Sequence, residues 1–95
     1  MELKIDKKIK ETTLNNGTVE YLPFVLINDD RFSIWCNPNG TAGHLMQNPS
    51  GIGMEWKCAT IGLAKSMLDK KIEDHIAYLK QEEGKKVKSE RIISF

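Results

Sequence analysis

The sequence has few of the residues that mark specialised protein classes. It contains two cysteines in 95 residues, whereas a secreted disulfide scaffold of this size carries roughly four to eight, so we expect both thiols to stay reduced. Seven glycines and three prolines exclude collagen-like and low-complexity classes. The longest apolar run, residues 22–27, contains a proline and is too short to span a bilayer, and no signal-peptide pattern opens the chain. These absences predict a soluble, cytoplasmic protein.

The net charge of the chain is also small. Fourteen Lys and Arg residues oppose thirteen Asp and Glu residues, which gives a formal net charge of +1. This balance excludes a general basic coat for nucleic acid and an acidic solvating tail. A hydrophobic content of 40% is enough for a core, and 95 residues suit one domain, so we predict a single domain over residues 1–95.

Residues that carry catalytic or metal chemistry are sparse. The thiol and imidazole groups are separated by seven, thirteen and sixteen residues along the chain, at Cys36, His44, Cys58 and His75. Zinc modules use close pairs of ligands, so we predict no metal site and no cofactor. The acidic residues of the later chain alternate with lysines, as on a solvated helix face, and do not form a catalytic carboxylate pair. We therefore predict that the protein is not an enzyme.

The pattern of the first 36 residues predicts an antiparallel meander. Apolar residues alternate with charged ones over residues 3–9, and a hairpin signal, Asn-Asn-Gly, stands at 15–17. A second strand is predicted over 18–27. A polar turn at 28–30 then leads to a third strand over 31–36, in which apolar and polar residues alternate cleanly.

A long loop is predicted next, over residues 37–53. It is rich in Asn, Gly, Pro and Ser, and it holds two tetrads, at 37–40 and 48–51, that suit type I turns. A loop of this length is functional, folded on itself or mobile, and we favour a functional loop. Residues 54–58 alternate again and predict a short fourth strand.

A long amphipathic helix is predicted over about residues 61–83. Thr60 can cap its start and Gly84 its end. One apolar stripe recurs at steps of three and four residues, at Ile61, Ala64, Leu68, Ile72, Ile76 and Leu79. The fold class is therefore α+β: a three- to four-stranded antiparallel sheet with one long helix packed on one face. The following residues, 85–95, can add an edge strand or dock on a partner chain.

One helix leaves one face of the sheet uncovered. If the helix covers Phe32 and Ile34, the alternation of the third strand places Trp35 on the other face. We predict that this uncovered face is a binding surface, and its residues are of types enriched at binding hot spots: Tyr21, Val25, Ile27, Arg31 and Trp35. Homodimerisation through this face would bury it as well. Two alternatives remain. Pro23 can introduce a bulge that changes the register of the second strand, or the 37–53 loop and residues 92–95 can cover the face from within the same chain.

A weak DNA- or RNA-binding domain is the alternative function. Two clusters of basic residues provide its candidate phosphate contacts, Lys7, Lys8 and Lys10 near the start and Lys85, Lys86, Lys88 and Arg91 near the end. These clusters can grip a phosphate backbone if both flank one edge of the domain. Only two arginines are present, however, so base readout would be poor.

A resemblance to known domains also suggests which kind of genome encodes the protein. Residues 60–72 contain a threonine that opens a helix, an Ala-Lys pair at 64–65 and then Leu68 and Ile72. This segment, placed after three strands, resembles the small three-strand-plus-helix domains of phage and mobile elements, among them the arm-type DNA-binding domains of tyrosine recombinases. The chain lacks the basic strands with which those domains read DNA. The resemblance therefore implies a fold and a phage-like origin more than an activity.

The sequence as a whole predicts a small non-enzymatic binding module. It has the format of a phage or mobile-element accessory protein that binds a partner protein, and inhibits or modulates it, through an exposed aromatic sheet face. We expect a homodimer in the cytoplasm, with an unidentified protein as partner and with no membrane involved.

Overall fold

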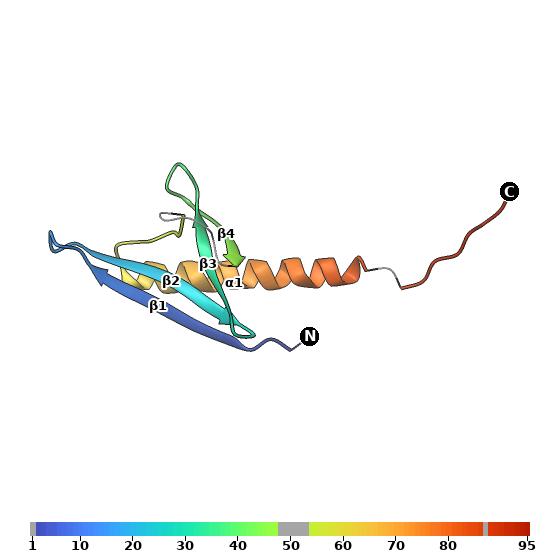
Figure 1. Cartoon of the computed structure of the whole chain (residues 1–95), viewed down its shortest axis with the longest axis horizontal. Helices are drawn as coiled ribbons and strands as arrows, with labels where there is room; N and C mark the ends of the chain where they lie inside the picture. The colour runs from blue at the N-terminus through green and yellow to red at the C-terminus, as the bar shows by residue number, and fades with distance from the viewer. Residues whose placement is uncertain (1, 48–53, 87) are drawn as a thin grey trace.

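The computed structural model describes residues 2–47, 54–86 and 88–95 of the chain (Figure 1). Four strands form one antiparallel sheet in the order β1-β2-β3-β4, and a single long helix follows them in sequence. The elements are β1 (Ile5–Thr13), β2 (Val19–Ile27), β3 (Asp30–Cys36), β4 (Ala42–Gln47) and α1 (Ile61–Gly84). The helix lies along one face of the sheet, behind it in Figure 1. The predicted α+β class is confirmed.

Two tight turns fix the register of the first three strands. The β1–β2 hairpin turns at Gly17, whose φ of 85° is the left-handed conformation that glycine adopts at low cost. The β2–β3 hairpin turns on Asn28 and Asp29, both at positive φ (51° and 70°), as in a two-residue type I′ turn. This turn places Val25 directly opposite Phe32, so the two side chains share one face of the sheet.

The predicted loop over 37–53 is wrong in its first half. The tetrad at 37–40 does form a tight turn, closed by a 2.8 Å bond from the Gly40 N–H to the Asn37 carbonyl. That turn is short enough to make a hairpin, so the chain re-enters the sheet at once as β4. The second tetrad, at 48–51, lies outside the described residues.

The predicted fourth strand over residues 54–58 is also wrong. Here β2 and β3 pair over four residues only and then separate, and residues 54–58 lie in the gap as a wedge segment. The Trp56 N–H donates to the Ile34 carbonyl of β3 at 2.7 Å, while Cys58 exchanges two backbone bonds with Tyr21 of β2, at 2.8 and 3.0 Å. The wedge segment thus satisfies backbone groups of both strands, with Trp56 filling the gap at 7% exposure.

The helix begins where the sequence predicts. The Thr60 side chain accepts a hydrogen bond from the Leu63 N–H at 3.2 Å, which satisfies one of the free donors of the first turn. Three residues of the predicted stripe, Ala64, Leu68 and Ile72, are buried against the sheet. A 2.8 Å ion pair from Lys7 of β1 to Asp69 joins the helix to the edge of the sheet. Among the described residues, no helix is both long and apolar enough to cross a membrane.

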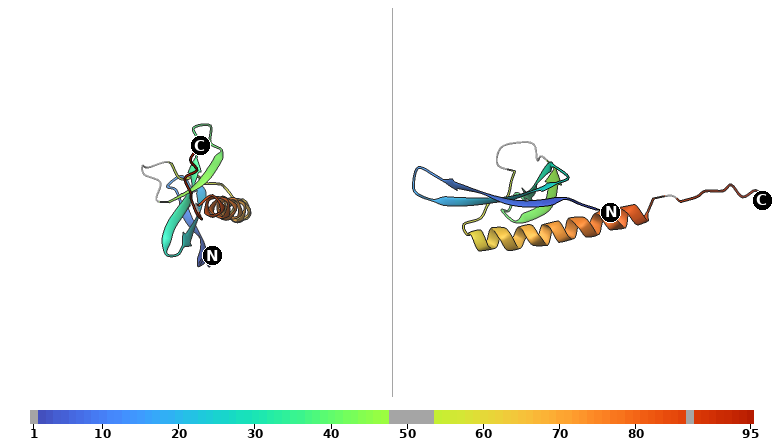
Figure 2. Two further views of the ribbon diagram at one scale, coloured as in Figure 1. Left: turned by 90° about the vertical axis from the view of Figure 1, so that its right-hand side faces the viewer. Right: turned by 90° about the horizontal axis from the view of Figure 1, so that it is seen from below.

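The second half of α1 and the residues after it project from the body. A compact chain of 95 residues has a radius of gyration of about 12 Å, whereas this chain has 17.7 Å and extents of 73 × 28 × 19 Å. Residues 85–95, which we call the arm, continue past the helix and away from the sheet (Figures 1 and 2). In the described part of the arm no strand forms, so the predicted edge strand is absent there.

Candidate protein-binding face

The five residues predicted for the uncovered face divide between the two sides of the sheet. Val25 and Ile27 are 0% and 5% exposed and belong to the core beneath α1, so the prediction that they are exposed is wrong. Tyr21 shares their side of β2 by alternation, and it is half-buried. Arg31 and Trp35 lie on the opposite side, as predicted. The reason is the type I′ turn, which pairs Val25 with Phe32 and so turns the odd residues of β2 toward the helix.

The side of the sheet that α1 does not cover, here called the outer face, is built from the even residues of β2 and the odd residues of β3. Its members are Leu22, Phe24, Leu26, Arg31, Ser33 and Trp35, and Glu55 of the wedge segment joins them by pairing with Trp35. Phe24, Leu26 and Trp35 are half-buried, so part of each apolar side chain meets solvent. The hairpin turn at 28–29 was the signal that could have identified Phe24 and Leu26, because it fixes which residues of β2 face the same way as Trp35.

A charged pair stands at the centre of the outer face. The Arg31 guanidinium donates through Nη1 to Glu55 Oε2 at 2.9 Å and lies over the Phe24 ring, 4.6 Å from its centroid. Partial burial raises the pKa of Glu55, but the nearby Ser33 hydroxyl and Arg31 outweigh it, and the pKa is held below its usual range. Ser33 is fully buried, and among residues 2–47, 54–86 and 88–95 its Oγ has no hydrogen-bond partner of ordinary geometry. The pair is thus ionised and pre-oriented at neutral pH.

Trp35 is seated on a bulge between β3 and β4. Ile34 pairs with Leu45 and Cys36 pairs with Ala42, so two residues of β4 oppose Trp35 alone. One of these two is Gly43, where a Cβ atom would lie 3.1 Å from both Trp35 Cδ1 and the Trp35 carbonyl oxygen. The indole therefore rests against bare backbone, which holds it on the outer face.

We expect Gly43→Ala to displace Trp35 and to destabilise the fold by about 1–3 kcal/mol, the usual cost of overpacking. The backbone carbonyl of Trp35 cannot move aside as a flexible side chain can, so the strand pair itself must shift. Urea unfolding measures the loss. Gly62→Ala is the matched control, because a Cβ there meets no atom within 4 Å and alanine favours the helix. Equal stability of Gly43→Ala and wild type would contradict the inference that Trp35 packs directly against Gly43.

The remaining chemistry-bearing side chains do not assemble into a site. Over residues 2–47, 54–86 and 88–95, no three His, Cys, Asp or Glu side chains are grouped to hold a metal ion. Cys36 and Cys58 are free thiols, and burial raises the pKa of Cys58. His75 packs against Phe32 with ring centroids 5.3 Å apart, and burial lowers its pKa. It therefore acts as a partly buried packing residue at the edge of the core.

The two lysine clusters lie on separate parts of the molecule. The first is on β1 and the second is on the arm, beyond the end of α1 (Figure 1). Lys7, Lys8 and Lys85 pair with Asp69, Asp6 and Glu82, at 2.8, 3.4 and 3.5 Å. The condition for a shared grip on phosphate, that both clusters flank one edge, is therefore not met, because the helix carries the second cluster away from the sheet.

The resemblance of residues 60–72 to arm-type DNA-binding domains stays a prediction. It implies three strands before the helix, and the structure has four. No protein-family model, curated protein or solved structure matches the chain.

Proposed function

We propose that the chain is a small non-enzymatic protein-binding module. It acts in the cytoplasm, as a phage-like accessory protein does, by occupying the surface of a partner protein and inhibiting or modulating that partner. The observation that carries the proposal is the outer face: Arg31, Phe24 and Trp35 stand together, half exposed, on the side of the sheet that α1 does not cover.

This composition suits a binding hot spot. Tryptophan and arginine are the side chains most enriched at such positions, since they combine a large apolar surface with directed hydrogen bonding. Arg31 is already held by Glu55 and by the Phe24 ring, so it loses little side-chain entropy when a partner covers it. A partner that excludes water from the face would strengthen both of these contacts.

The charges around the outer face favour apolar contact over phosphate binding. Besides Arg31 and Glu55, the side chains of Lys8 and Asp6 lie 3.4 Å apart, and Lys57 lies 3.7 Å from Glu20. Opposite charges in pairs produce little net field. The alternative, a weak DNA- or RNA-binding domain, would depend on lysines such as Lys7 and Lys85, which are themselves paired with acids.

Capture of partners from a cell lysate tests the proposal. Tagged wild type, Trp35→Ala and Arg31→Ala are compared with and without nuclease, after circular dichroism has shown that each variant folds. Tyr78→Ala is the matched control, because it removes an exposed aromatic ring from α1, away from the outer face. Captured proteins are identified by mass spectrometry, and their Kd values are then measured with purified components.

Loss of Trp35 is expected to weaken binding by about 2 kcal/mol, or about thirtyfold in Kd, as at an interface hot spot. Tyr78→Ala should bind as wild type does. Capture that disappears on nuclease treatment, while Trp35→Ala still binds, would contradict the proposal and favour the nucleic-acid alternative.

A further inference from the structure

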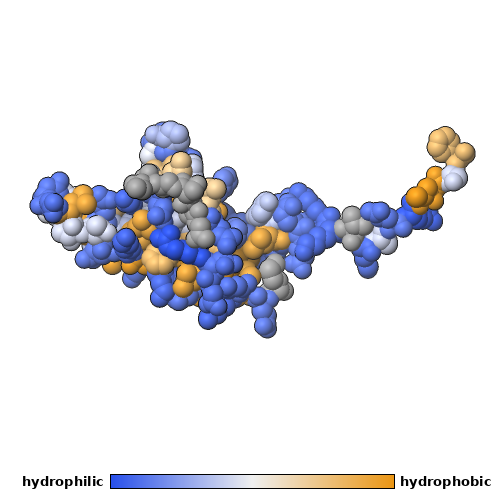
Figure 3. Space-filling model, in the orientation of Figure 1, coloured by the Kyte–Doolittle hydropathy of each residue, from blue (hydrophilic) through white to orange (hydrophobic). Residues whose placement is uncertain are grey.

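The arm presents apolar side chains that no residue described by the structure covers. Ile92 and Phe95 are 98% and 122% exposed, and Ile93 is largely exposed as well. Figure 3 shows this apolar end of the arm standing apart from the body. Four basic residues and one acid give the arm a net charge of +3: Lys85, Lys86, Lys88 and Arg91 against Glu90. The arm is thus basic along its first part and apolar beyond it.

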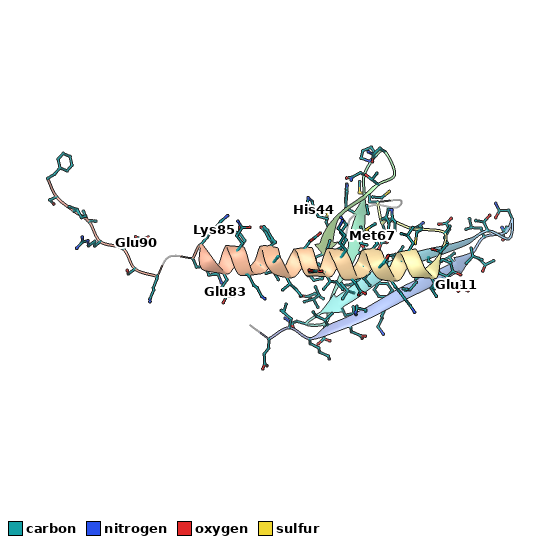
Figure 4. The ribbon with its side chains drawn as sticks, turned by 180° about the vertical axis from the view of Figure 1, so that it is seen from behind. Glu11, His44, Met67, Glu83, Lys85 and Glu90 are labelled. Atoms are coloured by element: carbon teal, nitrogen blue, oxygen red, sulfur yellow. The ribbon has the colours of Figure 1, made fainter. Side chains whose placement is uncertain are left out.

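The second half of α1 has the opposite charge. Over residues 73–84, four acids oppose one lysine, Glu73, Asp74, Glu82 and Glu83 against Lys80, for a net charge of −3. The carbonyl end of the helix dipole adds to this negative potential. Figure 4 looks onto α1 and shows Glu83 and Lys85 at this end, where the acidic helix meets the basic arm.

An open apolar groove runs beside this half of the helix, between α1 and β1. Its cavity volume is about 490 Å³. The apolar lining comes from Ile5, Ile72, Ile76 and Ala77, and the charged rim from Lys7, Asp69, Glu73 and Lys80. Lys7 and Asp69 neutralise one another at 2.8 Å, which leaves Glu73 as the rim carboxylate available to a basic arm.

We propose that the arm of one copy docks in the β1–α1 groove of a second copy, and that the protein is a homodimer closed by two such exchanges. Ile92, Ile93 and Phe95 lie on the apolar lining, and Arg91 pairs with Glu73. Lys85 and Glu82 already pair within each chain, and the opposite charges that remain on the arm and on residues 73–84 favour and orient the contact. A two-fold dimer buries both arms and both grooves, so no apolar arm is left to extend the assembly.

A second copy is favoured over the same chain because of how the helix ends. A chain that reverses after a helix uses a left-handed residue, most often glycine. Gly84 has no positive φ, and Lys85 caps the helix in the right-handed region (φ −87°, ψ −7°). Its N–H donates back to the Glu82 carbonyl at 3.2 Å. The arm therefore leaves along the helix axis, away from its own groove (Figure 2).

The arm is long enough for the exchange. Eleven extended residues span about 36 Å, whereas α1 covers only about 17 Å between Asp69 and Lys80. If the two α1 helices run antiparallel with their C-terminal ends side by side, each arm is within reach of the groove of the other copy. This dimer uses a different surface from the outer face, so it does not depend on the proposed function.

Sedimentation equilibrium tests the dimer, over a range from about 1 μM to about 1 mM in which weak to moderate affinities are resolved. Wild type is expected to reach twice the 10.8 kDa chain mass. Ile92→Asp with Ile93→Asp should weaken the dimer at least about tenfold in Kd, as expected when charge enters an apolar contact. Ser89→Asp with Ser94→Asp is the matched control, which changes the arm charge equally but keeps its apolar residues.

Two further measurements identify the contact. Glu73→Arg and Arg91→Glu should each weaken the dimer, and the double variant should restore it, because the pair is re-formed with reversed signs. The arm variant and Ala77→Glu, a groove variant, should each dimerise more weakly than wild type when studied alone. Mixed together they should form a heterodimer through the one intact arm and the one intact groove.

Three outcomes would overturn the proposal. The first is a protein that stays monomeric at every concentration. If its amides at 92–95 are also protected from hydrogen exchange, the arm docks in the groove of its own chain. The second is a dimer that survives the arm variant. The third is a dimer lost in Trp35→Ala, which would place the contact on the outer face. The arm variant is also used to capture partner proteins. If it captures them as strongly as wild type does, the proposed binding function holds even where the proposed dimer does not.

Discussion

Trp56→Ala is expected to remove a large share of the stability of the fold. Truncation of a buried tryptophan costs about 3–5 kcal/mol, since it removes apolar contact and leaves a cavity. A small domain has a total stability of only about 5–15 kcal/mol. The Trp56 side chain belongs to the core cluster, and the strands on either side cannot close on a cavity there because Ile34 and Tyr21 are both bonded to the backbone of the wedge segment. The fold therefore has little means of collapsing onto the cavity.

Urea unfolding followed by circular dichroism measures this loss. Trp35→Ala is the matched control, because it removes the same side chain from a half-buried site on the outer face and should cost much less. The chain has two tryptophans, so each variant also keeps one indole as a fluorescent reporter of its own site. Equal losses for the two variants would mean that Trp56 does not support the gap between the strands.

The sequence identified the elements whose signals are local. The helix was predicted to within one residue at its end, because its Thr60 cap and its apolar period lie within the segment itself. The predicted cap at Gly84 is wrong, since Gly84 is part of the helix and Lys85 caps it. The α+β class followed from the same kind of pattern. Residues 42–47 and 54–58 were predicted wrongly because their structure depends on distant partners: β4 pairs with β3, and the wedge segment enters a gap that only the finished sheet contains.

The binding face was predicted in part for a related reason. Both sides of β2 are apolar, so alternation alone could not decide between Val25 and Phe24 for the outer face. The two-residue turn at 28–29 decides it, through the pairing of Val25 with Phe32. Glu55 could not have been found in this way, since it lies 24 positions along the chain from its partner Arg31.

The net charge of +1 conceals a separation of charge along the chain. Residues 73–84 and the arm carry −3 and +3 and follow one another directly, so they cancel in the total. Charge separated in this manner gives a chain a directional surface without making it acidic or basic overall. The neutral balance therefore argues against phosphate binding by the body and for contact between oppositely charged segments.

Leu68→Ala is expected to destabilise the fold by about 2–5 kcal/mol, the range for a buried leucine. Leu68 is 2% exposed and belongs to the cluster that joins α1 to Val25, Ile34 and the rest of the core. Most of the stability of a helix in a protein comes from packing of its apolar face. Loss of this contact should therefore loosen the whole of α1 from the sheet, and with it the groove beside β1.

Leu63→Ala is the control for this prediction, since it makes the same change on the same helix at a side chain that is 45% exposed. It should shift the free energy of unfolding by no more than about 0.5 kcal/mol. Amide exchange adds a second readout, in which Leu68→Ala should lower the protection of α1 residues 64–76 while Leu63→Ala leaves it unchanged. If the two variants lose equal stability, helix propensity and not packing on the sheet would hold α1, and the groove that depends on this packing would lose its physical basis.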